Sequence, residues 1–163
     1  MMNREVNVNK IEIELKDKND FVSKYNNNRI SKDLYNYIKE EIKLLNVKEQ
    51  INIEIKSKFK MTDEEKELLA LNIKKTTNEE IIDLEYIEQK VLLKEMLFLM
   101  IGIIITFLWF IVRKSEFISE IILIIGWLFV WEAVKKLVFS RVENRLNIKR
   151  LKQIVKSDID FID

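Results

Sequence analysis

The feature that most constrains this chain is a run of 17 residues without a charge, from Met96 to Val112. A helix of about 20 residues, at 1.5 Å per residue, spans the roughly 30 Å hydrocarbon core of a bilayer. Residues 91–93 are also apolar and extend the run backwards past Lys94 and Glu95, which can snorkel or pair. The alternative is a core helix of a soluble protein, but such a helix rarely stays apolar on every face. The run therefore predicts a transmembrane helix.

A second apolar segment, Phe117–Phe139, follows after a connector of four residues. Its uncharged part, Ile121–Trp131, has 11 residues and is by itself too short to span a membrane. Tryptophans resemble interfacial anchors and paired lysines suit the headgroup zone. The candidate anchors are Trp109, Trp127 and Trp131, and the paired lysines are Lys135 and Lys136. Because so short a connector allows only a tight turn, we expect a helical hairpin with both chain ends on one side of the membrane.

The distribution of positive charge predicts which side this is. Residues 135–163 carry eight Lys and Arg, including Arg141 and Arg145, whereas the connector carries two. Positive charge stays cytoplasmic, so both termini are expected in the cytoplasm, with the basic tail contacting anionic lipid. The first apolar run lies far from the N-terminus, and no cleavable signal peptide is expected. Ile, Lys and Asn make up 62 of the 163 residues, which indicates an AT-rich bacterial genome and hence a bacterial cytoplasmic membrane.

Composition excludes most enzyme chemistry. The chain has no Cys, no His and no Pro, and its two glycines lie in the apolar segments. Thiol nucleophiles, zinc–thiolate sites, the usual general base and phosphate-cradling glycine loops are therefore excluded. We expect no catalytic residues, no cofactor and no metal site, and thus a protein that is not an enzyme. Nucleic-acid binding is disfavoured because residues 1–91 have a net charge of −2 with alternating signs.

The polar N-terminal part predicts a small α/β domain. Alternating apolar residues indicate two strands, over 5–16 and over 50–59; the change of phase between Val8 and Ile11 indicates either a bulge or a late start of the first strand. Ser31 is expected to cap a helix that ends near Leu45. The segment 21–30, with its three consecutive asparagines, is interpreted as a loop.

The next helix signals come just before the membrane segments. Thr62–Glu65 forms a capping box that opens a helix through Ile73. The stretch 76–80 is expected to break that helix and start another, which runs through 81–90 into the first membrane helix.

The last residues of the chain alternate between apolar and acidic side chains. The alternatives are a third strand and a frayed terminus. A two-stranded sheet is marginal, and the hairpin returns the chain to the cytosolic side. We therefore predict that Ile159 and Phe161 pair with the sheet, after a helical extension over 141–156.

Together these patterns predict an α+β membrane protein, with a transmembrane helical hairpin attached to a small cytosolic α/β domain. The expected division is 1–90 for the cytosolic domain, 91–140 for the hairpin, and 141–163 for a basic helix with a C-terminal strand.

The chain resembles a family of small bacterial membrane proteins with two spans and no characterised activity. The similarity lies in Asp33-Leu34 with Tyr37-Ile38, in Gly126-Trp127 with Trp131-Glu132 and Val134, and in Arg141 and Arg145. It covers most of the chain and implies the architecture only. Loops in that family are usually rich in proline, whereas this chain contains none.

Two intramembrane carboxylates and two glycines are the candidate functional residues. Glu132 is a functional candidate because ionisable groups are costly in a membrane, but Lys135 and Lys136 stand at the spacing of a local ion pair. Glu120 lies one turn into the second segment, where an interfacial position explains it equally well. Gly102 and Gly126 are expected to allow close helix packing.

Two functions follow as hypotheses. The first is a non-enzymatic protein whose membrane hairpin anchors a cytosolic interaction domain, which binds a protein partner or assembles as a homo-oligomer. The second is a homo-oligomeric cation channel in which Glu132 lines the pore.

Overall fold

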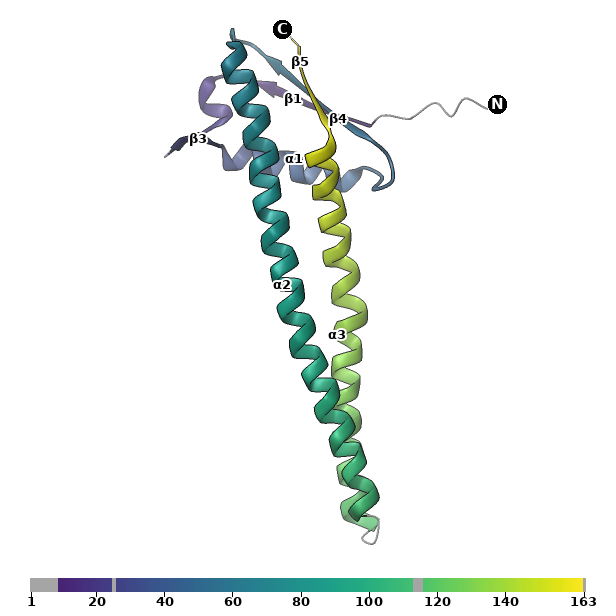
Figure 1. Cartoon of the computed structure of the whole chain (residues 1–163). Coiled ribbons are helices and arrows are strands. Elements are labelled where there is room, and N and C mark those ends of the chain that lie inside the picture. Colours follow the sequence, from purple (N-terminus) through teal and green to yellow (C-terminus); the bar gives the residue numbers. More distant parts are fainter. Residues whose placement is uncertain (1–8, 25, 113–115, 163) are drawn as a thin grey trace, which may run out of the picture. The chain divides into compact units, whose positions relative to one another are not determined.

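The computed structural model describes residues 9–24, 26–112 and 116–162. The fold is mostly helical with a small sheet. In chain order the elements are β1 (Asn9–Leu15), a 3-10 turn η1 (Lys18–Asp20), β2 (Val22–Ser23), β3 (Asn26–Ile30), α1 (Lys32–Leu44), β4 (Ile51–Ser57), α2 (Asp63–Val112), α3 (Glu116–Lys156) and β5 (Asp158–Ile162) (Figure 1).

The contacts within the chain define two compact units. The sheet unit holds the chain up to Ile82 together with the segment from Leu146 onward. The helical unit holds Asp83–Arg145, which includes the C-terminal part of α2 and the N-terminal part of α3. The N-terminal and C-terminal segments therefore belong to one unit. The division expected from the sequence was instead into three consecutive segments, with boundaries at residues 90 and 140.

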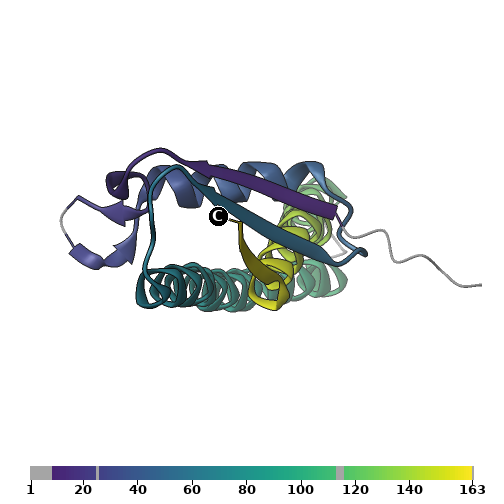
Figure 2. The ribbon, with the colours of Figure 1, turned by 90° about the horizontal axis from the view of Figure 1, so that it is seen from above.

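A three-stranded parallel sheet organises the sheet unit, with β4 between β1 and β5 (Figure 2). Ile53 of β4 lies opposite Ile11 on one side and Ile159 on the other. Parallel strands need long crossover connections. Helix α1 lies in the crossover from β1 to β4, and α2 and α3 lie in the crossover from β4 to β5.

The C-terminal strand predicted from the alternation is confirmed. Phe161 pairs with Ile55 of β4, and the whole strand Asp158–Ile162 lies in parallel register with residues 52–56. The pairing turns a marginal two-stranded arrangement into a three-stranded sheet.

One face of the sheet carries the core and the other carries paired charges. The buried apolar residues of the sheet unit come from all its larger elements: Ile11, Ile13, Leu15, Ile38, Ile42, Ile51, Ile53, Ile55, Leu69, Ile73, Leu151 and Ile154. On the opposite face Lys10 pairs with Glu54, and Lys58 Nζ lies 2.7 Å from Glu14 Oε1. The alternation of the strands thus separates an apolar inner face from a charged outer face.

The predicted helix starts are confirmed by their capping bonds. Ser31 Oγ accepts the backbone N–H of Leu34 at 3.2 Å at the start of α1. At the start of α2, Thr62 N–H donates to Glu65 Oε2 at 3.0 Å, and Glu65 N–H donates to Thr62 Oγ1 at 3.3 Å. This reciprocal pair is the capping box that the sequence predicts.

Two predictions about local structure are wrong. The segment 21–30 is not only a loop, because β2 and β3 form an antiparallel pair in which Val22 lies opposite Ile30. The asparagines that suggested a loop lie in β3. Although asparagine has a weak strand propensity, the buried side chains of Phe21 and Ile30 stabilise the β2–β3 pair.

The expected break at 76–80 is also absent, since α2 is one helix of 50 residues. Thr77 is fully buried and its hydroxyl donates to the Ile73 carbonyl oxygen at 2.7 Å. Burial of Thr77, whose hydroxyl is satisfied by this bond, outweighs the low helix propensity of threonine. The first strand begins at Asn9 among the described residues, so the bulge or late start expected after Val8 lies outside them in part.

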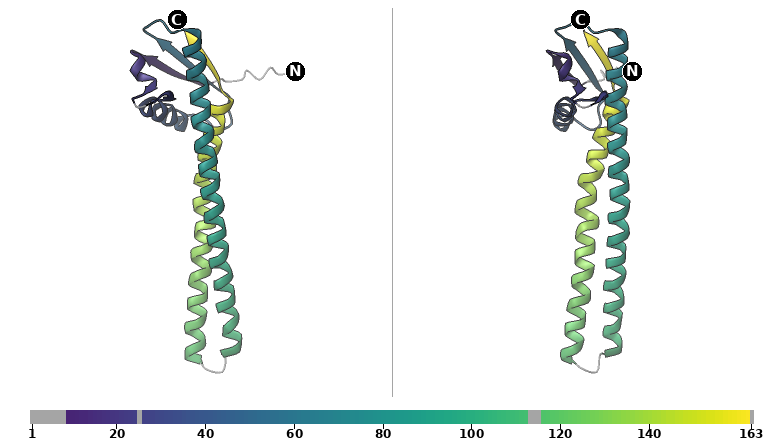
Figure 3. Two further views of the ribbon diagram at one scale, coloured as in Figure 1. Left: turned by 60° about the vertical axis from the view of Figure 1, so that its left-hand side comes forward. Right: turned by 90° about the vertical axis from the view of Figure 1, so that its left-hand side faces the viewer.

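Both long helices contain a segment that is long and apolar enough to cross a membrane. Only 11% of that window in α2 and 17% in α3 is buried. Residues 83–112 of α2 and 116–145 of α3 run side by side in opposite directions (Figure 1 and Figure 3). The helical extension predicted over 141–156 is confirmed as the last part of α3.

Candidate functional site

The helical unit has an apolar outer surface. Large apolar side chains that are more than 60% exposed come from both helices: Leu93, Met100, Phe107, Phe110, Ile111, Phe117, Ile124, Trp127, Leu128, Phe139 and Val142. Monomeric soluble proteins rarely expose so large an apolar patch. This surface is suited to a hydrocarbon environment or to another apolar surface.

Small residues lie at a close approach of the two helices. A Cβ atom added to Gly102 would lie 2.8 Å from Val130 Cγ2, and one added to Gly126 would lie 2.5 Å from Thr106 Oγ1. The carbonyl oxygen of each glycine also lies within 3.2 Å of the Cβ position of the other. The structure therefore brings Gly102 and Gly126 together, and neither position has room for a side chain.

Three charged residues meet near one end of the uncharged runs. Lys136 Nζ lies 3.0 Å from Glu132 Oε1 on its own helix and 3.8 Å from Glu95 Oε1 on α2. The Glu95 side chain is only 4% exposed, whereas that of Glu132 is 45% exposed. Lys136 thus links a buried carboxylate to an exposed one across the helix pair.

A second charged cluster lies two turns before Glu95 on α2. Arg145 Nε donates to Glu88 Oε1 at 3.2 Å, and Arg141 Nε lies 3.6 Å from the same oxygen. A small cavity is lined by both glutamates and by Lys136, Arg141 and Asn144. The two clusters together contain as many positive as negative charges, so they form a neutral polar seam.

Sequence reasoning proposed Glu132 and missed Glu95. Glu88 and Glu95 stand seven residues apart, which places both on one face of a helix. This spacing is the sequence signal that could have identified Glu95. The burial of that face of α2 is apparent only once α3 is packed against it. Glu95 is therefore the buried carboxylate that the structure adds to the candidate residues.

The other sequence candidates lie on the outside. Glu120 and Lys135 are exposed, and so are Trp127 and Trp131. These two tryptophans line a shallow apolar groove with Ile124 and Leu128. Trp109 is partly buried and packs edge-on against Phe110, with ring centroids 5.0 Å apart.

The sheet unit has its own polar network. Tyr35 is buried, and its hydroxyl donates to Glu80 Oε2 at 2.7 Å. Burial raises the pKa of Tyr35 well above its ordinary value. Lys39 Nζ lies 3.2 Å from Glu80 Oε1 and 4.8 Å from the centre of the Tyr35 ring. These bonds join α1 to α2 within the sheet unit.

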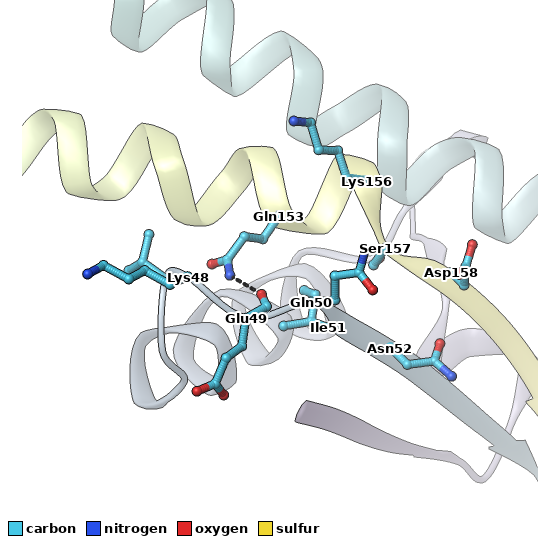
Figure 4. A pocket seen from close by; sticks show the side chains of 10 residues that line it. Lys48, Glu49, Gln50, Ile51, Asn52, Gln153, Lys156, Ser157 and Asp158 are labelled. Atoms are coloured by element: carbon cyan, nitrogen blue, oxygen red, sulfur yellow. Dashed lines mark hydrogen bonds between the residues drawn. The ribbon is translucent and has the colours of Figure 1, made fainter. Parts of the chain in front are cut away.

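A cavity of about 540 Å³ opens at the start of β4 and β5 (Figure 4). Gln153 donates to the Glu49 carbonyl oxygen at 2.7 Å along one wall. Two lysines and two carboxylates are among the lining residues: Lys48, Glu49, Lys156 and Asp158. The lining has no net charge and selects neither anions nor cations. Within residues 9–24, 26–112 and 116–162, no group of three metal-ligating side chains is present.

No protein-family model, no curated protein and no solved structure matches this chain.

Proposed function

We propose that this chain is an integral membrane protein whose helical unit crosses a bilayer twice and anchors the sheet unit as a cytosolic, non-enzymatic interaction domain. The observation that carries the proposal is the outer surface of the helical unit, where large apolar side chains such as Phe107 and Trp127 are exposed on both helices. A membrane is the environment in which this surface is stable.

The interior of the helical unit supports the same proposal. In hydrocarbon, helices gain little from burying apolar side chains against one another and associate through small residues and polar contacts. The Gly102–Gly126 contact and the ion pairs of Glu88 and Glu95 are of that kind.

The cytoplasmic position of the sheet unit is proposed from charge. Lys135 and Lys149 are exposed on α3, and further cations follow toward the C-terminus. Positive residues beside a membrane segment remain cytoplasmic. Since β5 returns to the sheet, the N-terminal and C-terminal segments share that compartment in this proposal.

The absence of cysteine makes orientation directly testable. Two single-cysteine variants, Asn78→Cys in the sheet unit and Ser115→Cys in the connector, are probed with a membrane-impermeant maleimide. In inverted inner-membrane vesicles the Asn78→Cys variant should be labelled and the Ser115→Cys variant should be protected. Intact cells with a permeabilised outer membrane should give the reverse. Protein that alkaline carbonate extracts, with neither variant labelled in intact cells, contradicts membrane anchoring.

The channel hypothesis receives less support because Glu132 is engaged by Lys136 at 3.0 Å. A cation beside an acidic ring partly cancels its attraction for permeating cations. Planar-bilayer recordings of wild type and Glu132→Gln test it: a conductance that falls in the variant would favour a pore over a simple anchor. Light scattering of the chain in nanodiscs tests the proposed homo-oligomer independently.

A further inference from the structure

The charges of the helical unit limit the apolar band that it offers to a bilayer. Glu120 and Glu132 on α3 lie six residues before and six residues after Gly126. Six residues of helix correspond to about 9 Å. The two carboxylates therefore stand at about equal distances on either side of the glycine crossing.

Because α2 and α3 have a fixed register, the carboxylates that limit the apolar band on α3 limit it for both helices. Gly126 contacts Gly102, and Lys136 contacts Glu95, so the residues of α2 and α3 run past each other in a fixed antiparallel order. On α2 the uncharged run Met96–Val112 has 17 residues, corresponding to about 25 Å. On α3 the uncharged run Ile121–Trp131 has 11 residues, corresponding to about 17 Å.

The hydrocarbon core of a bilayer of ordinary thickness extends beyond both Glu120 and Glu132. Half of a hydrocarbon core of roughly 30 Å is about 15 Å, and the carboxylates stand about 9 Å from the crossing. Glu132 has Lys136 as its partner, at 3.0 Å. Glu120 is exposed and has no ion pair within the described residues. A core centred on the crossing would thus enclose an exposed carboxylate.

From this geometry we infer that the helical unit fits a bilayer whose hydrocarbon core is thinner than the ordinary value of roughly 30 Å, and that Glu120 sets the limit at the end near the connector. The partner of the apolar surface is accordingly a membrane of short-chain lipids or a locally thinned one. This inference rests on the proposed membrane anchoring and adds the thickness of the bilayer to it.

The test is a competition between two populations of phosphatidylcholine vesicles, one with fourteen-carbon and one with twenty-two-carbon monounsaturated chains. The full chain is synthesised in a cell-free system containing both populations. The vesicles are separated by density through different encapsulated solutes, and the protein in each is quantified. We expect about fivefold more wild-type protein in the thin vesicles, because each ångström of mismatch carries a small cost.

Two variants assign the effect to Glu120. Glu120→Leu removes the carboxylate from the apolar band and should reduce the preference to about twofold or less. Glu143→Leu makes the same change at an exposed position of α3 outside the band and should leave the preference unchanged. An unchanged preference in Glu120→Leu overturns the role of Glu120.

The other outcomes separate this inference from the proposed function. Equal partition of the wild type, or a preference for the thick vesicles, overturns the inference and leaves membrane anchoring in place. Equal partition is also what a second copy covering Glu120 would produce. Protein that floats with neither population overturns the membrane proposal itself.

Discussion

The two units of this chain place the same kinds of side chain in opposite positions. The sheet unit buries isoleucines and leucines, with Ile53 and Ile55 fully inaccessible, and exposes charges. The helical unit buries Gly102, Gly126 and Glu95 and exposes phenylalanines and tryptophans. The hydrophobic effect explains the first arrangement in water. The second arrangement is stable only where the surroundings are themselves apolar.

A buried isoleucine in the sheet unit gives the sharpest contrast. Ile53→Ala removes a side chain with no exposed surface from the central strand and should destabilise the sheet unit by about 4 kcal/mol. Ile104→Ala removes a side chain that is 57% exposed and should change stability by less than about 0.5 kcal/mol in detergent micelles. Amide exchange under native conditions measures both. A large effect of Ile104→Ala would mean that a further surface covers α2.

The second prediction concerns the C-terminal strand. Ending the chain after Ser157 removes β5 and exposes the edge of β4. The loss of Ile159 and Phe161 from the sheet should cost the sheet unit about 3 kcal/mol. The helical unit should be unaffected, and its three tryptophans, at 109, 127 and 131, report on it separately by fluorescence. Fast amide exchange throughout β5 in the intact chain would show that the strand contributes nothing.

The third prediction reverses the ordinary effect of alanine in a helix. Alanine stabilises a helix by about 1 kcal/mol relative to glycine. At Gly126 the new Cβ would lie 2.5 Å from Thr106 Oγ1 and 3.0 Å from Thr106 N. Gly126→Ala should therefore destabilise the helical unit by about 1–2 kcal/mol. Tryptophan fluorescence during denaturation measures it, with Leu123→Ala on the exposed face as the control. A stabilised variant would mean that the helices are not closely packed there.

The sequence predicted the elements whose signal is local. The periodicity of residues 31–45 and the alternation of 51–57 define α1 and β4, and the alternation after Ser157 defines β5. The prediction of a helix break near Thr77 was wrong, because the conformation there depends on burial against the rest of the sheet unit. No local sequence pattern shows that burial. The role of Glu95 was missed for a similar reason. Its burial depends on the register between α2 and α3, and the glycine contact that sets this register joins residues far apart in the chain.

The smallest expected effect concerns Asp20, at the turn that follows β1. Its Oδ2 atom accepts the backbone N–H of Lys16 at 2.7 Å and that of Asp17 at 3.0 Å. These bonds, with Asp17 the larger contributor and Lys16 the second, hold the pKa of Asp20 below its ordinary value of 3.8.

A group with a lowered folded-state pKa stabilises the fold above its unfolded pKa, and this contribution is lost as the pH falls through the folded value. Asp20→Asn should therefore destabilise the sheet unit slightly at neutral pH, and the difference from wild type should begin to shrink below about pH 4 and vanish only below the lowered folded-state pKa. Amide exchange of β1, with the two proteins compared at the same pH, measures it. The helical unit should show no difference at any pH, because Asp20 belongs to the sheet unit. A difference that persists in acid would mean that Asp20 acts through its shape and not through its charge.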